Sequence, residues 1–484
     1  MTRSNLKTIA RLTVVAVWIV LFGILLERDY FIKTLDTRER LVLRRDREES
    51  FSGVYFKEER IGYVRNRLVR DDAGDGYRLR QEAYLVLNIL EQSHSIRMLI
   101  HADLGNDLLL RHFDFELSSP FYSMTAEGRV DGSTVNFILT TGKEKIKDSI
   151  RLAAPPFLST NRRGYLLSAD LKAGDKLRIP YFDPISLSGK DTVLEYKGYD
   201  KVLIKGRIQR LHHFSESFAG MRIESWLDDT GKVIKEESPA GFVFIAEPEF
   251  KATDIKTTGR EILSSVSVRV EGAMPPDFAS RTRLGYRLSY PAEAEVEIDL
   301  DRQELADGIL TVTREEVPDD AAEPCPGPAA KLASTPYVQA SHFQIAKLTE
   351  MLVDDKMSAM TKVRSLSAWV FDNLEKRPVL GIPDAVTTLR IRRGDCNEHA
   401  VLFAALARNV GIPTRIVAGV IFHEGAFYYH AWNEVCLDGS WLSLDTTRNE
   451  IPADVSHIKF VEGETREQIK IGGLLGKLKI EAVP

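Results

Sequence analysis

Residues 393–413 read RGDCNEHAVLFAALARNVGIP, and the rest of the chain is organised around this run. Its apolar part, 400–407, predicts a helix that is buried on all sides. Gly411 is placed to cap that helix and Pro413 to stop it. Cys396 therefore stands at the N-terminus of a buried helix. There the positive end of the helix dipole favours a thiolate, and free backbone N–H groups can receive an oxyanion.

Two later runs carry a histidine and an aspartate. Residues 427–437, FYYHAWNEVCL, alternate like a strand that includes His430. Residues 441–447, WLSLDTT, end a second strand on Asp445, where we expect this side chain to be partly exposed. The order predicts a triad in which Cys396 is the nucleophile and His430 takes its proton, while Asp445 holds the imidazole in one tautomer.

Aromatic residues near the histidine are candidates for substrate contacts. Alternation places four side chains on one face of the 427–437 strand: Tyr428, His430, Trp432 and Glu434. Trp432 would shield the imidazole from water. We also expect three residues to line the acyl pocket: Tyr428, Trp432 and Trp441.

Other assignments of these residues remain open at this stage. Glu434 could replace Asp445 as the partner of the histidine, but four residues of extended strand carry it about 13 Å away. Asn433 would suit a Cys–His–Asn arrangement, although it should point to the opposite face. Four residues could in principle be combined into a metal site: Cys396, His399, His423 and His430. His399 is better placed to cap or pack the helix, so we predict no metal site. Arg408 and Arg415 are expected to form structural ion pairs.

The combination of motifs resembles the transglutaminase-like superfamily of cysteine enzymes. The matching segments are Gly394-Asp395-Cys396, 398–400, 406–408, 411–413, Arg415, 430–435 and 445–447. The resemblance covers about residues 332–460 and implies a papain-like α+β core with the Cys–His–Asp triad and no cofactor. Thr446 departs from the family pattern, because many relatives carry proline after the aspartate. No upstream residue matches the oxyanion side chain of the superfamily.

The resemblance implies attack of the Cys396 thiolate on an amide carbonyl of a peptide or protein, which gives a thioester acyl-enzyme. Water would then release an acid, as in a peptidase or amidase, whereas an amine would form a new amide, as in a cross-linking acyltransferase. Hydrolysis is the expected outcome, because bacterial-looking relatives are often proteolytic. A scaffold that binds peptide without catalysis is the alternative from a different class.

The N-terminal region predicts a membrane anchor. Leu12–Leu26 is an apolar run without charges, and Glu27-Arg28-Asp29 follows where a cleavage site of small residues would be needed. We therefore predict one transmembrane helix within residues 1–30, then a charged spacer over 31–50. Long domains translocate largely regardless of flanking charge, so the body is expected in the periplasm, anchored to a bacterial inner membrane.

The remaining chain divides by periodicity. Residues 51–250 alternate with period two and predict an antiparallel β domain, with a hairpin turn at 228–231. Residues 251–331 predict a short β segment and a proline-rich linker. Residues 332–484 predict the transglutaminase-like domain, in which two helices precede the cysteine and a tail strand over 477–482 returns to the sheet.

Composition sets the outer limits. The length of 484 residues predicts two or three domains, and 44% hydrophobic residues suffice for a normal core. A net charge of −5 gives no electrostatic reason to expect nucleic acid as a partner. Three cysteines are too few for a disulfide framework. Whether Cys325 pairs with Cys436 stays open, since the sequence does not supply the distance between them.

Overall fold

The computed structural model describes residues 33–34, 47–71, 75–89, 92–120, 122–141, 144–158, 163, 166–167, 171–184, 187–218, 221–238, 241–255, 267–319, 322–326, 331–379 and 381–483. The predicted membrane helix within residues 1–30 lies outside this part of the chain, as does most of the charged spacer. Among the residues described, none belongs to a helix with the length and apolarity to cross a membrane.

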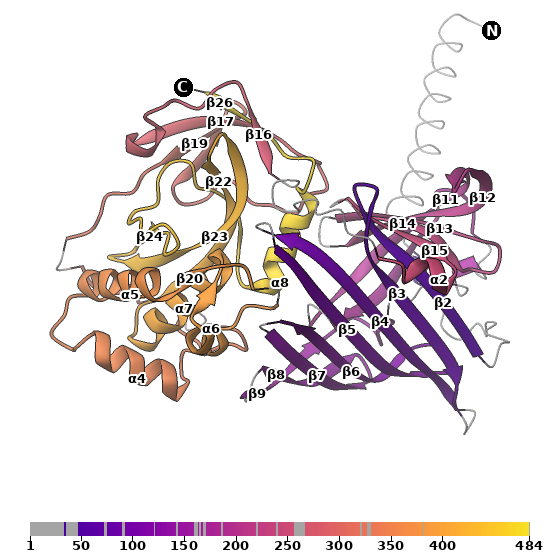
Figure 1. The fold of residues 1–484 in the computed structure, drawn as a ribbon. Helices are drawn as coiled ribbons and strands as arrows, with labels where there is room; N and C mark the ends of the chain where they lie inside the picture. Colours follow the sequence, from indigo (N-terminus) through magenta and orange to yellow (C-terminus); the bar gives the residue numbers. More distant parts are fainter. Residues whose placement is uncertain are drawn as a thin grey trace, which may run out of the picture.

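The N-terminal half forms one large antiparallel sheet that curls around its own core (Figure 1). Its strands are β1 (Lys33–Thr34), β2 (Arg47–Phe56), β3 (Glu59–Arg70), β4 (Gly76–Ile89), β5 (Gln92–Gly105), β6 (Leu110–Ser119), β7 (Tyr122–Asp131), β8 (Thr134–Thr141), β9 (Glu144–Arg151), β10 (Lys176–Asp183), β11 (Ser188–Ile204), β12 (Arg207–Phe218), β13 (Met221–Leu227), β14 (Val233–Glu237) and β15 (Phe242–Glu247). β15 pairs with β2, which joins the meander β10–β15 to the meander β2–β9, and β1 adds a parallel edge on β10. The predicted β region and its hairpin at 228–231 are confirmed.

The C-terminal half combines a second sheet with helices. The strands are β16 (Val268–Glu271), β17 (Arg283–Ser289), β18 (Gln303–Ala306), β19 (Ile309–Thr313), β22 (Thr414–His423), β23 (Ala426–Leu437), β24 (Ser440–Leu444), β25 (Ile458–Glu462) and β26 (Lys479–Val483). The tail strand returns to this sheet as predicted, between β17 and β16. Residues 251–331, expected to be a β segment and linker, supply β16–β19 to the sheet that carries His430.

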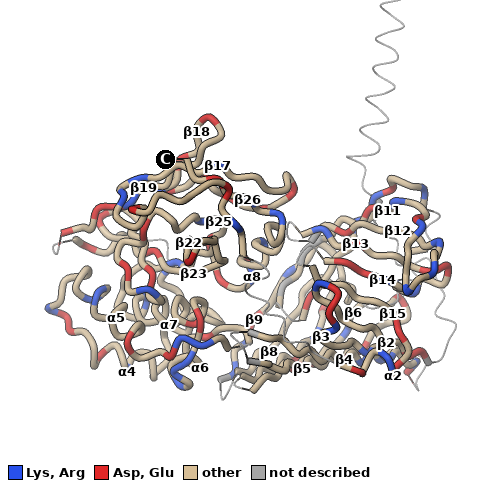
Figure 2. Tube along the Cα trace, turned by 45° about the horizontal axis from the view of Figure 1, so that its top comes forward, with Lys and Arg blue, Asp and Glu red and all other residues tan. Residues whose placement is uncertain are grey.

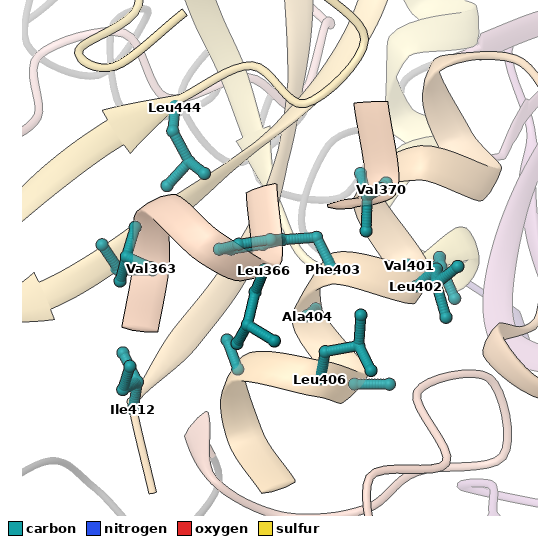
Figure 3. Packing of buried hydrophobic residues seen from close by; sticks show 14 of the residues in the cluster. Val363, Leu366, Val370, Val401, Leu402, Phe403, Ala404, Leu406, Ile412 and Leu444 are labelled. Carbon is teal, nitrogen blue, oxygen red and sulfur yellow. The ribbon is translucent and has the colours of Figure 1, made fainter. Parts of the chain in front are cut away.

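Helices cover one side of this sheet. They are α4 (Phe343–Leu352), α5 (Ala359–Asn373), α6 (Ala385–Ile391) and α7 (Cys396–Asn409), with two short helices elsewhere, α2 (Glu249–Ala252) and α8 (Thr465–Gln468), and two 3₁₀ turns, Phe278–Ser280 and Ile469–Gly473. The two helices predicted before the cysteine are α4 and α5; α6 was not predicted. Figure 3 shows α5 packed on α7 through Leu366 and Phe403, with Leu444 of β24 close by.

The apolar run of α7 lies at the centre of this core. Ala400 to Ala407 are all 3% exposed or less, so the predicted all-round burial is confirmed. Two-residue strands β20 (Glu375–Lys376) and β21 (Arg393–Gly394) pair in parallel, and the chain passes directly from β21 into α7. The start of α7 is therefore fixed both by its core and by the strand before it.

The two halves contact each other next to the segment that leads to α7. Three residues of the C-terminal half, Tyr337, Val379 and Ile382, are buried in the core of the large sheet. Gly381 lies so close to the Tyr122 ring that a Cβ there would be 2.4 Å from it. α8 stands between the halves (Figure 1). Basic and acidic residues are interspersed over both halves (Figure 2).

Cys325 and Cys436 form a disulfide, with their Cα atoms 5.4 Å apart. The bond joins the proline-rich segment before α4 to the end of β23, 111 residues further along the chain. The disulfide settles whether these two cysteines pair, which the sequence left open. Cys396 is then the one free cysteine of the chain.

Candidate active site

One backbone N–H in the first turn of α7 has no acceptor among the described residues. Asp395 is the N-cap, and its side chain accepts hydrogen bonds from the N–H groups of Asn397, at 2.8 Å, and Glu398. The Asp395 N–H donates to the Glu398 carboxylate at 2.9 Å, and the first regular helical bond runs from the His399 N–H to the Asp395 carbonyl at 3.1 Å. A helix start leaves four N–H groups without intrahelical partners. Within the part of the chain that the structure describes, the Cys396 N–H is the one of these four without an acceptor.

The Cys396 thiol is half-buried beside the middle of β23, and the backbone N–H of Ala431 donates a hydrogen bond to it. Burial raises the pKa of the thiol well above its usual value, and the nearby carboxyl groups of Asp395, Glu398 and Asp445 act in the same direction. The expectation of a resting thiolate is therefore wrong. The helix dipole predicted it, but burial and the carboxyl groups outweigh the dipole.

His430 lies on β23, opposite Gly419 of β22. Its Nε2 is 2.8 Å from Oδ2 of Asp445. Since an ionised carboxylate can only accept, Nε2 carries the proton and donates it. Nδ1 is then the nitrogen that can accept a proton. The next residue, Ala431, already contacts the Cys396 sulfur, so the structure brings the three predicted residues together.

Asp445 is fully buried, which corrects the expectation of a partly exposed strand end. Its Oδ1 accepts hydrogen bonds from the N–H groups of Thr447, at 2.8 Å, and Arg448, at 3.3 Å. Burial alone would raise its pKa, but His430 and a second histidine, His457, hold the pKa well below its usual range. Asp445 therefore stays an anion. Two backbone bonds between Asp445 and Glu450, of 2.9 and 3.0 Å, close the turn that carries Thr446 in place of proline.

His457 and Asp454 were not predicted. His457 Nε2 is 3.2 Å from Oδ2 of Asp445, and its Nδ1 is 3.0 Å from Oδ1 of Asp454. Burial lowers the pKa of His457, but the two carboxylates outweigh this effect and raise it to about 9. The pKa of Asp454 falls to about 2, since its bonds to His457 and Ser456 outweigh burial. The spacing Asp454-x-x-His457 is the only sequence signal, and it matches no motif.

The three aromatic residues predicted to contact substrate differ in how near they lie to His430. Trp432 is 1% exposed and stacks on His430, with ring centroids 6.4 Å apart at 18°. It shields the imidazole, as expected. Tyr428 is half-buried two residues before His430 on the same strand. Trp441 lies 3.9 Å beneath the Arg415 guanidinium, near the far end of β23, so the structure does not bring it to the histidine.

The competing candidates have other partners. Glu434 is buried and ion-paired with Arg415, at 2.5 Å, and Lys459, at 3.1 Å. The amide of Asn433 donates to the Ala400 carbonyl at 2.9 Å, on the face away from His430. The His399 ring bonds the Asp395 carbonyl at 2.7 Å and packs in the helix, as predicted. Ion pairs of Arg408 and Arg415 are confirmed.

Among the described residues, two largely buried groups have metal-ligand spacing. One is Glu450, Asp454 and His457, in which His457 Nδ1 is hydrogen-bonded to Asp454. The other is His430, Asp445 and His457. Both histidines, however, direct a ring nitrogen at the same oxygen, Oδ2 of Asp445, in ordinary hydrogen bonds. The hydrogen bonds account for the close approach, and we assign no metal to either group.

Comparison with known proteins supports the resemblance. Residues 346–446 match the sequence model of the transglutaminase-like superfamily, and the match includes Cys396, His430 and Asp445. This part of the chain is therefore transglutaminase-like, and the match supports the expected relation to papain-like enzymes. No curated protein matches the chain.

Three solved structures have limited similarity to the chain. A candidate cysteine protease from Cytophaga hutchinsonii is 15% identical with a TM-score of 0.26, over 45% of this chain and 85% of that one. A β-barrel-like protein of the domain of unknown function DUF1849 from Brucella abortus is 11% identical with a TM-score of 0.33, over 43% and 97%. A candidate protease from Parabacteroides distasonis is 13% identical with a TM-score of 0.20, over 67% and 63%. Such low TM-scores do not establish a shared fold.

Proposed function

We propose that the chain is a transglutaminase-like cysteine enzyme that attacks amide bonds of peptides or proteins through a thioester, with hydrolysis as the outcome. The observation that carries this proposal is the chain of contacts at the start of α7. The Cys396 thiol is held by the N–H of Ala431, and the adjacent His430 is held by Asp445 at 2.8 Å. Nucleophile, base and orienting carboxylate are thus in contact through their neighbours.

The raised pKa of the thiol determines how the first step proceeds. A neutral thiol is a weak nucleophile, so Nδ1 of His430 takes the proton as the sulfur attacks the amide carbon. The oxyanion that forms is placed to accept from the free N–H of Cys396 at the positive end of α7. His430 then gives the proton to the leaving amine, and the C–N bond breaks to leave the thioester.

The second step separates the two reactions that share this intermediate. In hydrolysis, His430 takes a proton from water, the hydroxide adds to the thioester carbon, and the acid leaves with return of the proton to sulfur. In the alternative, an amine takes the place of water and a new amide forms. A peptide-binding scaffold would need none of the contacts among Cys396, His430 and Asp445, which argues against that reading.

We expect an alkyne-tagged thiol probe to label the full chain at Cys396 and to leave Cys396→Ala unlabelled. Because the other two cysteines are paired, the experiment needs no further substitution. Incubation of denatured casein with the enzyme should then release new α-amino groups, which fluorescamine detects, and Cys396→Ala should release none. His423→Ala is a matched control, since this histidine is exposed at the end of β22.

Each result of that experiment is decisive. Labelling that persists in Cys396→Ala would refute the nucleophile. Incorporation of a fluorescent primary amine into casein, without new α-amino groups, would select the transferase. A labelled protein that does neither, on any member of a broad peptide library, would favour the scaffold.

We further propose that the body of the protein lies outside the cytoplasm of a bacterium and is anchored to the inner membrane by residues 1–30. The apolar run Leu12–Leu26 supports this placement, and so does the disulfide, because such bonds persist in oxidising compartments. Protease added to cells with a permeabilised outer membrane should digest the body and spare a cytoplasmic marker. Full protection of residues 51–484 would reverse the orientation.

A further inference from the structure

His457 is not one of the three predicted residues, yet it contacts two of them in a fully buried position. The side chain is fully buried between the end of β24 and the start of β25. Both ring nitrogens face carboxylate oxygens, Asp445 at 3.2 Å and Asp454 at 3.0 Å. The ring also meets the edge of Trp432, with centroids 5.2 Å apart, and that of His430 at 6.1 Å.

The hydrogen-bond geometry specifies the charge on this ring. A neutral imidazole has one N–H donor, whereas an imidazolium has two. Two carboxylate acceptors on opposite nitrogens are both satisfied only by the imidazolium. A buried carboxylate pair also needs a compensating cation, because uncompensated buried charge is strongly unfavourable. The pKa of about 9 for His457 agrees with this reading of the geometry.

We infer that His457 is a positioning residue: a buried imidazolium that bridges Asp445 and Asp454 and thereby fixes the carboxylate that orients His430. This inference rests on the proposed function of Cys396 and His430. Oδ2 of Asp445 accepts hydrogen bonds from both histidines. His457 therefore sets the direction from which His430 can bond the same oxygen.

The loop that carries His457 is held from three sides. Oδ1 of Asp454 accepts from the N–H and hydroxyl of Ser456 at 2.8 and 2.6 Å. Arg302 donates to the Ala453 carbonyl at 2.8 Å and to the Asp454 carbonyl. β25 also approaches β22 closely, because a Cβ on Gly419 would lie 1.9 Å from the carbonyl oxygen of Ile458. These contacts therefore hold His457 in one position relative to Asp445.

Other charged or titratable groups surround the bridge and belong to the same electrostatic unit. They are Asp445, Arg448, Glu450 and Asp454 from the turn after β24, His430 from β23, Tyr286 from β17, and Arg302. Burial and Asp454 raise the pKa of Tyr286, so this phenol stays neutral over the range in which His457 titrates. The pKa values of Asp445 and Asp454 are lowered, so both carboxylates of the bridge keep their charges near pH 9, and His457 is the group of the bridge that changes there.

A matched control stands two residues away. Lys459 is also a buried cation between two carboxylates, Asp301 and Glu434. It makes no contact with His430 or Asp445 among the bonds of the described residues. Lys459→Gln and His457→Gln thus remove the same kind of ion pair from the same part of the fold, and only one of them supports the orienting carboxylate.

The test is single-turnover acylation of the full chain by p-nitrophenyl acetate, with Cys396→Ala as background. The sulfur displaces p-nitrophenolate from the ester carbonyl, and the thiol proton passes to His430. We expect His457→Gln to acylate about 10–100-fold more slowly than wild type at pH 7, as for other losses of a positioning partner. The ratio of the two rates should fall toward one as the pH rises through about 9, where His457 loses its second proton. The ratio for Lys459→Gln should stay near one throughout.

Two results would overturn the inference. A ratio near one at pH 7 would show that Asp445 needs no support, and a large ratio without pH dependence would indicate a purely structural role. A measurement on the wild type guards against a variant that fails to fold. Histidine-selective NMR should find the His457 ring doubly protonated at pH 7 and titrating near pH 9. A neutral ring at pH 7 would contradict the inferred imidazolium. A burst that survives in Cys396→Ala would instead refute the proposed function, so the two failures are distinct.

Discussion

Replacing Asp445 by asparagine is expected to slow acylation of Cys396 by close to the roughly 10⁴-fold loss that the same change causes in a serine triad. An amide NH₂ in place of Oδ2 would present a proton to Nε2 of His430 and force the wrong tautomer. A resting thiolate would soften the loss, because it needs no base. Here burial raises the pKa of the thiol, so proton removal by His430 cannot be bypassed.

The same substitution should also lower stability. Asp445 accepts four hydrogen bonds, two from backbone N–H groups and two from the histidines. Asparagine has one oxygen, so in either orientation its NH₂ group faces two donors. Loss of one partner from a buried charge pair costs about 3–5 kcal/mol. We therefore expect a melting temperature lower by several degrees, where a partly exposed carboxylate would have given little change.

The pH dependence has a definite sign. The folded-state pKa of Asp445 is depressed, so its contribution to stability is present above its unfolded pKa of about 3.9 and is lost as the pH falls through the folded value. The difference in melting temperature between wild type and Asp445→Asn should persist from pH 7 down to about 5 and shrink only in stronger acid. Single-turnover acylation and calorimetry on the same preparation test both effects. A near-normal rate for Asp445→Asn, together with a crippled Glu434→Gln, would mean that Glu434 is the orienting carboxylate.

The candidate site shows which features a sequence can predict. Cys396, His430 and Asp445 each occupy a position that local pattern defines, namely a helix start, an alternating strand and a strand end. His457 has no such pattern. Its bond to Asp445 spans an irregular turn, and neither the direction of the ring nor its charge follows from spacing. The thiol environment was missed for a related reason: burial of the sulfur and the approach of Asp445 depend on tertiary packing, whereas the helix dipole follows from local sequence.

The fold likewise has features that local sequence predicts and features that it does not. Period-two alternation predicted the large sheet, and the apolar run 400–407 predicted the buried helix. Pairings between distant segments were not predictable. β26 inserts between β16 and β17, some two hundred residues earlier in the chain, and no local pattern selects those partners. Glu434 illustrates the limit well: alternation placed it on the face of His430, but not against Arg415 and Lys459.

Replacing Arg415 by methionine should cause the largest loss of stability without a loss of chemistry. Its guanidinium donates to Glu434 at 2.5 Å, to Glu462 at 2.9 Å and to Asp301, and its plane lies 3.9 Å from the Trp441 ring. The side chain is 8% exposed and that of Glu434 is 2% exposed, so the Glu434 carboxylate would be left cut off from water, whereas Asp301 and Glu462 are partly exposed. Lys459 still neutralises part of their charge. Even so, removing one partner of a buried ion pair costs about 3–5 kcal/mol.

Urea unfolding, followed by tryptophan fluorescence and far-ultraviolet circular dichroism, measures this loss. Arg287→Met is the matched control, because its pair with Glu481 is exposed at both ends and such pairs contribute about 0.2–1 kcal/mol. Arg415 binds Glu434, which lies four residues along β23 from His430, or about 13 Å. The rate of acylation per folded molecule should therefore match wild type in Arg415→Met below its unfolding transition. An equal, small change in both arginine variants would show that the buried cluster adds no more than a surface pair. A collapse of the acylation rate in the folded variant would instead place Arg415 within the catalytic unit.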